Sequence, residues 1–258
     1  EIPTEKGLKL LAPEKNKKDF IKPMEKVKNE IIQYKNEKKL LKKVPLYAPA
    51  GQSTQMIVGA SGESDAEIMY TSAFFYKSFN LKRVYYSGYV PISYDNRLPS
   101  IGTAVPLLRE NRLYQTDWLL RFYGFDVREL LNTEYPNLES DIDPKLSWAL
   151  RNLDQFPIDI NKADMRMLLR VPGLGVKSVH KIIGARRYRK LNWENLKSIG
   201  AALNRAKYFI TCDSRIFEGK DRTAAQLKGL IMNSSESKFR KELSTQLNLF
   251  DNQSLLPK

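Results

Sequence analysis

Apolar and polar residues alternate in blocks along residues 1–100, and these blocks favour strands and helices in turn. Short apolar runs predict strands at residues 7–13, 54–60 and 82–90. Residues 19–43 place apolar side chains three and four apart among lysines and glutamates, which predicts a helix buried along one stripe. Ser64 and Glu67 form a capping box that begins a further helix. This order predicts an α/β fold with a parallel sheet.

A different pattern, over residues 158–183, predicts two helices joined by a turn at residues 171–175. Apolar residues recur at helical spacing on both sides of that turn. Asn161 is the expected N-cap of the first helix, because its side chain can accept a hydrogen bond from the first turn. The pattern therefore predicts a helical hairpin.

The turn of this hairpin has the composition of an anion site. Pro172 ends the first helix, while Gly173 and Gly175 permit positive φ and the close approach of another backbone. The free N–H groups at the start of the second helix then lie beside Lys177. A phosphate diester fits such a site.

These residues resemble the helix-hairpin-helix family of DNA-binding modules. The family's hairpin reads apolar, Pro, Gly, apolar, Gly, two variable positions and then a small or apolar residue, and residues 171–179 match it position by position. In that family the hairpin N–H groups and the following lysine hold one phosphate without reading bases, which the resemblance implies for Gly173, Gly175 and Lys177. An ordinary helical hairpin with a glycine-rich turn is the alternative.

The hairpin pattern occurs twice at one constant spacing, which predicts a tandem unit. The aligned positions are Leu169, Gly173, Gly175, Val179 and Ile183 in the first copy and Leu196, Gly200, Ala202, Ala206 and Ile210 in the second. The second copy is degenerate, since Ile199 replaces Pro172 and Asn204 replaces Lys177. Residues 177–207 are rich in Lys and Arg and contain one acid, Glu194. The predicted DNA contacts are Gly173, Leu174, Gly175, Lys177, Ser178, Lys181, Arg186, Arg187, Gly200 and Arg205.

Overall charge favours the same partner. The 258 residues include 43 Lys and Arg against 29 Asp and Glu, a net charge of +14, so nucleic acid is expected to bind with an affinity that falls steeply with salt. No apolar run is long enough to cross a membrane. The one cysteine, Cys212, excludes an internal disulfide and fits a reducing cytoplasm, where DNA binding implies association with the nucleoid.

A second resemblance covers about residues 1–130. The stretches GLKLLAP, PAGQSTQMIVGASGESD, VYYSGYVPI and YQTDWLLRFYGF are similar to the second half of the radical S-adenosylmethionine barrel, in a subgroup that carries helix-hairpin-helix units and is assigned to DNA modification or repair. The resemblance implies the C-terminal half of a partial (β/α) barrel followed by an all-α helix-hairpin-helix domain. It also implies S-adenosylmethionine and a 4Fe–4S cluster in the complete protein. The implied cofactor wall is Gln52, Ser53, Gln55, Ile57, Gly59 and Tyr86, for which strand core and turn roles are the alternative.

The chain departs from this family at its defining feature. The family holds its cluster with three cysteines early in the barrel, and no such cysteines are present. This predicts that the N-terminal half is missing or lies on another polypeptide, and that the chain alone does not catalyse radical chemistry. A non-catalytic DNA-binding scaffold is one alternative. A helix-hairpin-helix glycosylase is another, although Asp213 lies too far along the chain for its catalytic acid.

The expected organisation has four parts: the barrel half at 1–100, a helical connector at 101–154, the tandem hairpins at 155–215 and a helical, flexible tail at 216–258. In the connector, helical spacing predicts interface core for Tyr114, Trp118, Leu119, Phe122 and Tyr123, with base stacking by Trp118 or Tyr123 as the alternative.

The tail contains a short apolar peptide at residues 246–250. It resembles the peptide by which bacterial repair and replication proteins bind the sliding clamp, with anchors at Gln246, Leu247, Leu249 and Phe250. A final helical turn docked on its own domain is the alternative.

Overall fold

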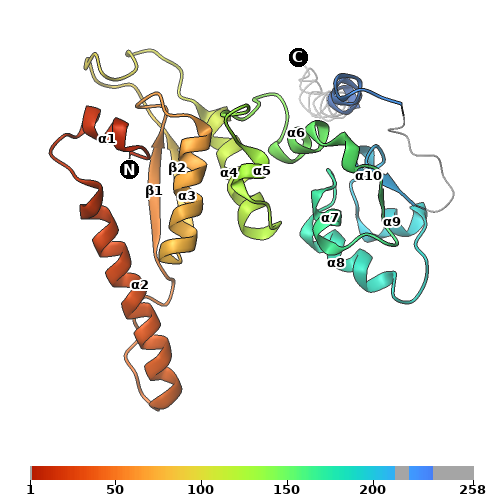
Figure 1. Ribbon diagram of the computed structural model, residues 1–258, viewed down its shortest axis with the longest axis horizontal. Coiled ribbons are helices and arrows are strands. Elements are labelled where there is room, and N and C mark those ends of the chain that lie inside the picture. The colour runs from red at the N-terminus through yellow and green to blue at the C-terminus, as the bar shows by residue number, and fades with distance from the viewer. Residues whose placement is uncertain (1, 213–220, 235–258) are drawn as a thin grey trace, which may run out of the picture. The chain divides into compact units, whose positions relative to one another are not determined.

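The computed structural model describes residues 2–212 and 221–234 and divides into two compact units, Glu1–Pro144 and Lys145–Lys258 (Figure 1). The division falls at the end of the acidic loop at residues 136–144. The clamp-like peptide at residues 246–250 lies outside the described residues.

The first unit contains the predicted alternation of helices and parallel strands. Its elements are α1 (Glu5–Leu11), α2 (Lys17–Leu40), β1 (Ser53–Val58), α3 (Asp65–Phe79), β2 (Arg83–Gly88), α4 (Leu107–Phe122) and α5 (Val127–Leu130). β1 and β2 pair in parallel, with Ser53 opposite Arg83 and Val58 opposite Gly88, and α3 connects them across one face (Figure 1). The α/β prediction is confirmed for a sheet of two strands within the described residues.

The helix predicted from the capping box of Ser64 and Glu67 begins as expected, as α3. The helix predicted at residues 19–43 begins two residues earlier, at Lys17, because Asn16 and Asp19 form a capping box at the start of α2. The predicted strand at residues 7–13 is wrong, because this segment forms α1. Its apolar residues also fit helical spacing, and Thr4 Oγ1 accepts a hydrogen bond from Gly7 N–H at 3.0 Å, which caps the helix.

The sheet is covered on one face only. Met56 and Val58 are buried toward the helices, whereas Ser53 and Gln55 on the opposite face are exposed. The strand predicted at residues 54–60 is present as β1, and it is buried on one face. α2 has no buried residue, and its predicted apolar stripe is only half covered.

Side chains close the free edge of β2. Val84 N–H donates to Tyr76 Oη at 2.9 Å and Gly88 N–H to Glu110 Oε2 at 2.8 Å. Between them, Tyr114 Oη accepts from Tyr86 N–H and donates to Tyr86 O, both at 3.0 Å. These bonds satisfy backbone groups that another strand would otherwise pair with.

The aromatic positions of α4 divide between core and surface. Leu119 is buried and Tyr114 packs edge-on against Tyr86, with ring centroids 5.1 Å apart. Trp118 and Phe122 are exposed, and their ring centroids lie 4.4 Å apart. The prediction of core positions is therefore wrong for these two residues. They lie on the outer side of the helix, because its inner side is already filled by Leu113, Thr116 and Asp117.

The second unit is mainly helical. Its elements are α6 (Pro144–Arg151), η1 (Leu153–Gln155), β3 (Ile158–Asp159), α7 (Met165–Arg170), α8 (Val176–Ala185), α9 (Trp193–Ile199), α10 (Leu203–Ala206), β4 (Ile210–Thr211) and a helix at residues 224–234. β3 and β4 form a short parallel pair, with Ile158 opposite Ile210. This pair joins the two ends of the segment that contains the hairpins.

The first hairpin helix begins later than predicted. Asp164, and not Asn161, is the N-cap of α7, and its Oδ1 accepts from Met167 N–H at 2.8 Å. Asn161 instead exchanges two hydrogen bonds with the backbone of Leu191, at 2.8 and 3.0 Å. Asn161 favours a local cap in the sequence, but the fold brings the backbone of Leu191, 30 residues further along the chain, within its reach.

Candidate nucleic-acid interface

The sequence repeat is also a structural repeat. α7 and α8 form one helical hairpin and α9 and α10 form another. The corresponding glycines, Gly173 and Gly200, have nearly the same positive φ, +88° and +85°. Gly175 and its counterpart Ala202 both stand at the N-cap of the following helix.

The two hairpins pack against each other, and this contact makes them unequal. Ala202 N–H donates to Gly173 O at 3.2 Å. A Cβ atom on Gly173 would lie 2.6 Å from Ala202 O, so no side chain fits there. Gly173, predicted as a phosphate contact, therefore has a packing role, and the N–H at the second turn is already bonded.

The peptide unit between Leu174 and Gly175 in the first hairpin turn is held from one side. The buried Lys145 donates from Nζ to Leu174 O at 2.7 Å. Since the C=O and N–H of one peptide unit point in opposite directions, Gly175 N–H points away from Lys145. The side chain of Leu174 is buried in the core, and its backbone N–H donates to Val171 O at 3.1 Å.

The start of α8, like that of α10, lacks the side-chain cap that α7 and α9 have. Asp164 caps α7, and Asn192 caps α9 by accepting from Asn195 N–H at 3.0 Å. Gly175, at the same position of α8, supplies no side-chain hydrogen bond. The first N–H groups of α8 have no acceptor within the helix, and the exposed Lys177 stands in this first turn. The arrangement suits an external anion.

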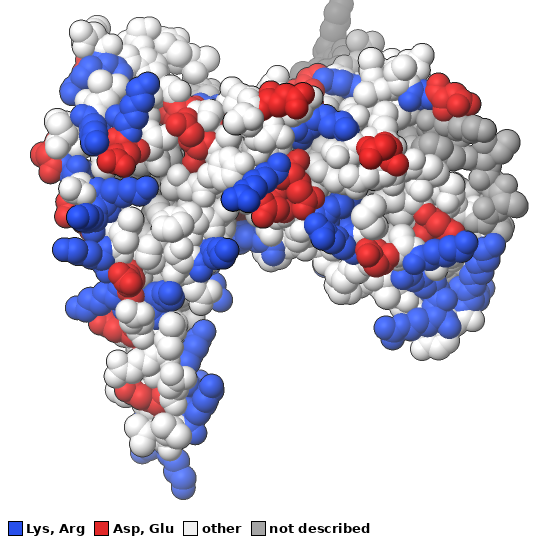
Figure 2. All heavy atoms as spheres, in the orientation of Figure 1, with Lys and Arg blue, Asp and Glu red and all other residues white. Residues whose placement is uncertain are grey.

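Cations lie along α8 and at its C-terminal end, but they do not all have the same role. Lys and Arg side chains gather over α8 and the turn that follows it (Figure 2). Lys177, Lys181 and Arg187 are exposed. Arg186 is half-buried and donates from Nη1 to Ile160 O at 3.0 Å and Ala163 O at 2.6 Å, so it holds the loop together.

The remaining predicted positions of this surface differ in exposure. Ser178 is half-buried in the first turn of α8, and Gly200 is exposed at the second turn. Arg205 is half-buried, with its Cβ 3.3 Å from the position that a Cβ of Gly173 would take. His180 is exposed on α8, and the Cys212 thiol is buried and donates to Leu191 O at 3.1 Å.

In the first unit, the predicted cofactor wall divides between the two faces of the sheet. Tyr86 is buried on the helix side and donates from its hydroxyl to Ser72 Oγ at 2.9 Å. Burial raises the pKa of Tyr86 well above its usual value. Gln52 donates from Nε2 to Phe79 O at 2.7 Å and to Met24 O at 3.1 Å. Both residues serve the fold of the unit itself.

The other four predicted wall residues lie on the open side of β1 or at its end. Ser53 and Gln55 are exposed and Ile57 is half-buried, in alternate positions of the strand. Gly59 follows with φ +84°, and its N–H donates to Glu63 Oε1 at 2.5 Å. The carboxylate of Glu63 thus occupies the donor that Gly59 would offer to a ligand.

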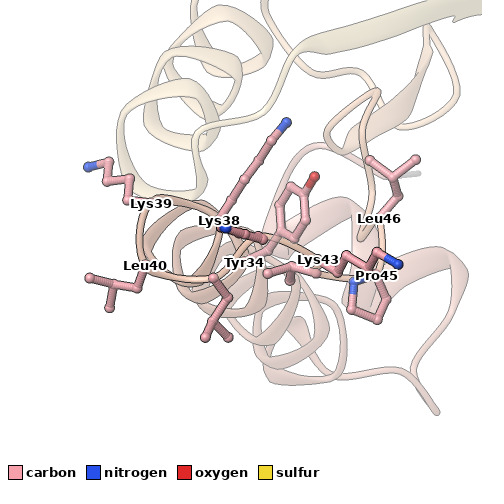
Figure 3. A pocket seen from close by; sticks show the side chains of 10 residues that line it. Tyr34, Lys38, Lys39, Leu40, Lys43, Pro45 and Leu46 are labelled. Atoms are coloured by element: carbon pink, nitrogen blue, oxygen red, sulfur yellow. The ribbon is translucent and has the colours of Figure 1, made fainter.

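A separate hollow lies at the C-terminal end of α2 (Figure 3). It is wide open, and it is lined by Tyr34, Lys38, Lys39, Leu40, Leu41, Lys42, Lys43, Val44, Pro45 and Leu46. Leu40 and Leu46 are strongly exposed. We assign no ligand to it, because a lysine-rich helix end in water accounts for these side chains.

Comparison of the chain with family models, curated proteins and solved structures found no match. No helix within the described residues is long and apolar enough to span a membrane. The described residues also bring together no group of three His, Cys, Asp or Glu side chains suited to a metal ion.

Two residues that support this site were missed in the sequence. Lys145 lies next to an acidic loop, where a lysine ordinarily remains solvated, and its contact with Leu174 depends on the packing of α6. Tyr188 stands in the basic run between the hairpins and is 91% exposed. The sequence alone does not indicate whether a tyrosine in that run is buried or exposed.

Proposed function

We propose that this chain binds DNA through its phosphate backbone, using the first helical hairpin of the second unit. The observation that supports this most strongly is the uncapped start of α8, where Gly175 replaces the capping side chains of the neighbouring helices. Lys145 holds the turn by its hydrogen bond to Leu174 O, and the exposed Lys177 adds a positive charge in the first turn of α8. Backbone N–H groups with one lysine hold a phosphate without contacting bases, so binding is independent of sequence.

The second hairpin supports the first. Its turn N–H is bonded to Gly173, and Asn204 replaces the lysine of the first copy. We infer that one hairpin contacts phosphate and that its degenerate copy holds it in position. The net charge of +14 adds the long-range attraction that such backbone binding requires.

Fluorescence anisotropy with two duplexes of unrelated sequence, measured over a range of salt concentrations, tests this proposal. We expect equal affinities for both duplexes and a linear fall of log K with log salt. Lys177→Gln should make that slope shallower by about one unit, whereas Lys35→Gln on α2, also exposed, should leave it unchanged. Sequence-dependent affinity, or equal effects of the two substitutions, would contradict the proposal.

For the first unit we propose a narrower role within a radical S-adenosylmethionine enzyme of DNA modification or repair. Ser53, Gln55 and Ile57 share the open face of the sheet, and we propose them as the part of the cofactor wall that this chain supplies. A 4Fe–4S cluster does not fit these residues, because it needs three thiolates and the sequence has one cysteine, which is buried in the second unit. Equilibrium dialysis measures the binding of S-adenosylmethionine and so tests the proposed cofactor wall. Ile57→Lys should abolish that binding.

We further propose that the peptide at residues 246–250 binds a sliding clamp, on the strength of its apolar anchors alone. Deleting these residues should abolish binding to purified clamp in surface plasmon resonance and leave DNA affinity unchanged. Clamp binding that survives the deletion would refute this assignment.

A further inference from the structure

The loop between α8 and α9 is held firmly at both ends. At its start, Arg186 donates from Nη1 to Ile160 O and Ala163 O, at 3.0 and 2.6 Å. At its end, the buried Leu191 exchanges two hydrogen bonds with Asn161 and accepts a third from the Cys212 thiol. The loop is therefore fixed to the body of the second unit at two points.

Between these anchors, residues 187–190 project into solvent. Arg187, Arg189 and Lys190 are exposed, and Tyr188 between them is 91% exposed. Tyr188 N–H donates to Ala185 O at 3.2 Å, which sets the backbone in a turn. Among the described residues of the second unit, Tyr188 is the one exposed Phe, Tyr or Trp side chain.

An exposed aromatic ring on an anchored loop can bind a ligand at a low cost in conformational entropy. Tyrosine has few rotatable bonds, so fixing it against a ligand costs little conformational entropy, and the anchored loop lowers that cost further. A ring flanked by cations suits a ligand that has both negative charges and flat apolar faces. Single-stranded nucleic acid offers both phosphates and base faces that are free to stack on an aromatic ring.

We propose that Tyr188 stacks on an unpaired base of DNA, while Arg187 and Arg189 hold the adjacent phosphates. This inference rests on the proposed function, because the start of α8 positions the duplex backbone. It adds a preference that the phosphate contact alone cannot give: DNA with unpaired bases, such as a single-stranded tail, binds more tightly than intact duplex. In a continuous duplex every base is stacked and paired, so Tyr188 finds no free base face.

Three fluorescent probes test the proposal with the full chain: a duplex, the same duplex with a single-stranded tail, and the free single strand. Tyr188→Ala should weaken binding of the tailed and single-stranded probes roughly 5- to 150-fold, the range for loss of one stacked base, and leave duplex binding unchanged. Tyr188→Phe should bind like the wild type, because phenylalanine keeps the ring. Tyr94→Ala is the matched control, since Tyr94 is 95% exposed in the first unit.

A second readout reports stacking directly. The fluorescence of 2-aminopurine in the single-stranded tail should be quenched by the wild type and by Tyr188→Phe, and not by Tyr188→Ala. Equal weakening on all three probes, or unchanged quenching with Tyr188→Ala, overturns the proposal. If the duplex binds through Lys177 and Tyr188→Ala has no effect, only this inference fails. If the wild type binds none of the probes, the proposed function fails with it.

Discussion

Replacing Gly175 by Asp separates the stability of α8 from its proposed ability to bind phosphate. Gly175 has φ −90° and ψ 165°, a conformation open to any residue, so the backbone accepts aspartate without strain. The new carboxylate can accept hydrogen bonds from the first turn of α8, as Asp164 does in α7. It then occupies the N–H groups that the phosphate would use.

The magnitudes have opposite signs for folding and for binding. Replacing glycine by a capping side chain stabilises a helix by a few tenths of a kcal/mol, and a negative charge at its start adds about 0.3–1 kcal/mol. Hydrogen bonds to a charged group contribute about 1.5–3 kcal/mol, so losing them to the aspartate weakens DNA binding roughly 10- to 150-fold. Gly175→Asp should therefore be slightly more stable than the wild type and defective in DNA binding.

Urea unfolding and fluorescence anisotropy with duplex DNA measure the two effects. Asn204→Asp is the control, because it adds the same charge at the exposed position of the second hairpin that corresponds to Lys177. It should lower affinity only slightly, and added salt should remove the difference. Gly175→Ser should give an intermediate loss, since it caps the helix without adding charge. Equal losses for Gly175→Asp and Asn204→Asp would refute the role given to the α8 N–H groups.

Three other perturbations test the fold. Gly173→Ala should destabilise the second unit by about 2–5 kcal/mol, because alanine is strained at φ +88° and its Cβ meets a backbone oxygen of the second hairpin; urea unfolding that matches the wild type would contradict this packing role. Tyr114→Phe should cost about 1–3 kcal/mol in thermal unfolding, since it leaves the N–H and C=O of Tyr86 without partners, and an unchanged melting temperature would show that this edge of β2 is closed in another way. The side chain of Arg97 donates hydrogen bonds to Asp95 and lowers the pKa of Asp95 from 3.8 to about 2. The contribution of this pair to folding stability is therefore complete above pH 4 and is lost as the pH falls through 2. An NMR titration should give this low midpoint, and Arg97→Gln should raise the midpoint only part of the way to the ordinary value, because the backbone N–H of residue 97 still donates to Asp95.

Local sequence determined the elements whose signals lie within a few residues. The capping box of Ser64 and Glu67, the parallel alternation of strands and helices, and the turn at residues 171–175 follow from such signals. The repeat predicted two hairpins with a common backbone, because the same glycine is needed wherever the chain turns with positive φ.

Only the tertiary structure decided which backbone groups remain free. From the sequence, Gly173 and Gly175 are equivalent candidates. In the fold, the Gly173 carbonyl accepts a hydrogen bond from Ala202 N–H and no space remains for a Cβ, while Lys145 bonds Leu174 O on the side opposite to Gly175 N–H. The strand predicted at residues 7–13 is a helix for a related reason. The spacing of its apolar residues fits both a strand and a helix, and only packing against the rest of the unit decides between them. Periodicity specifies how residues near in sequence are arranged, whereas hydrogen-bond partners and burial depend on segments far apart in the chain that the fold brings together.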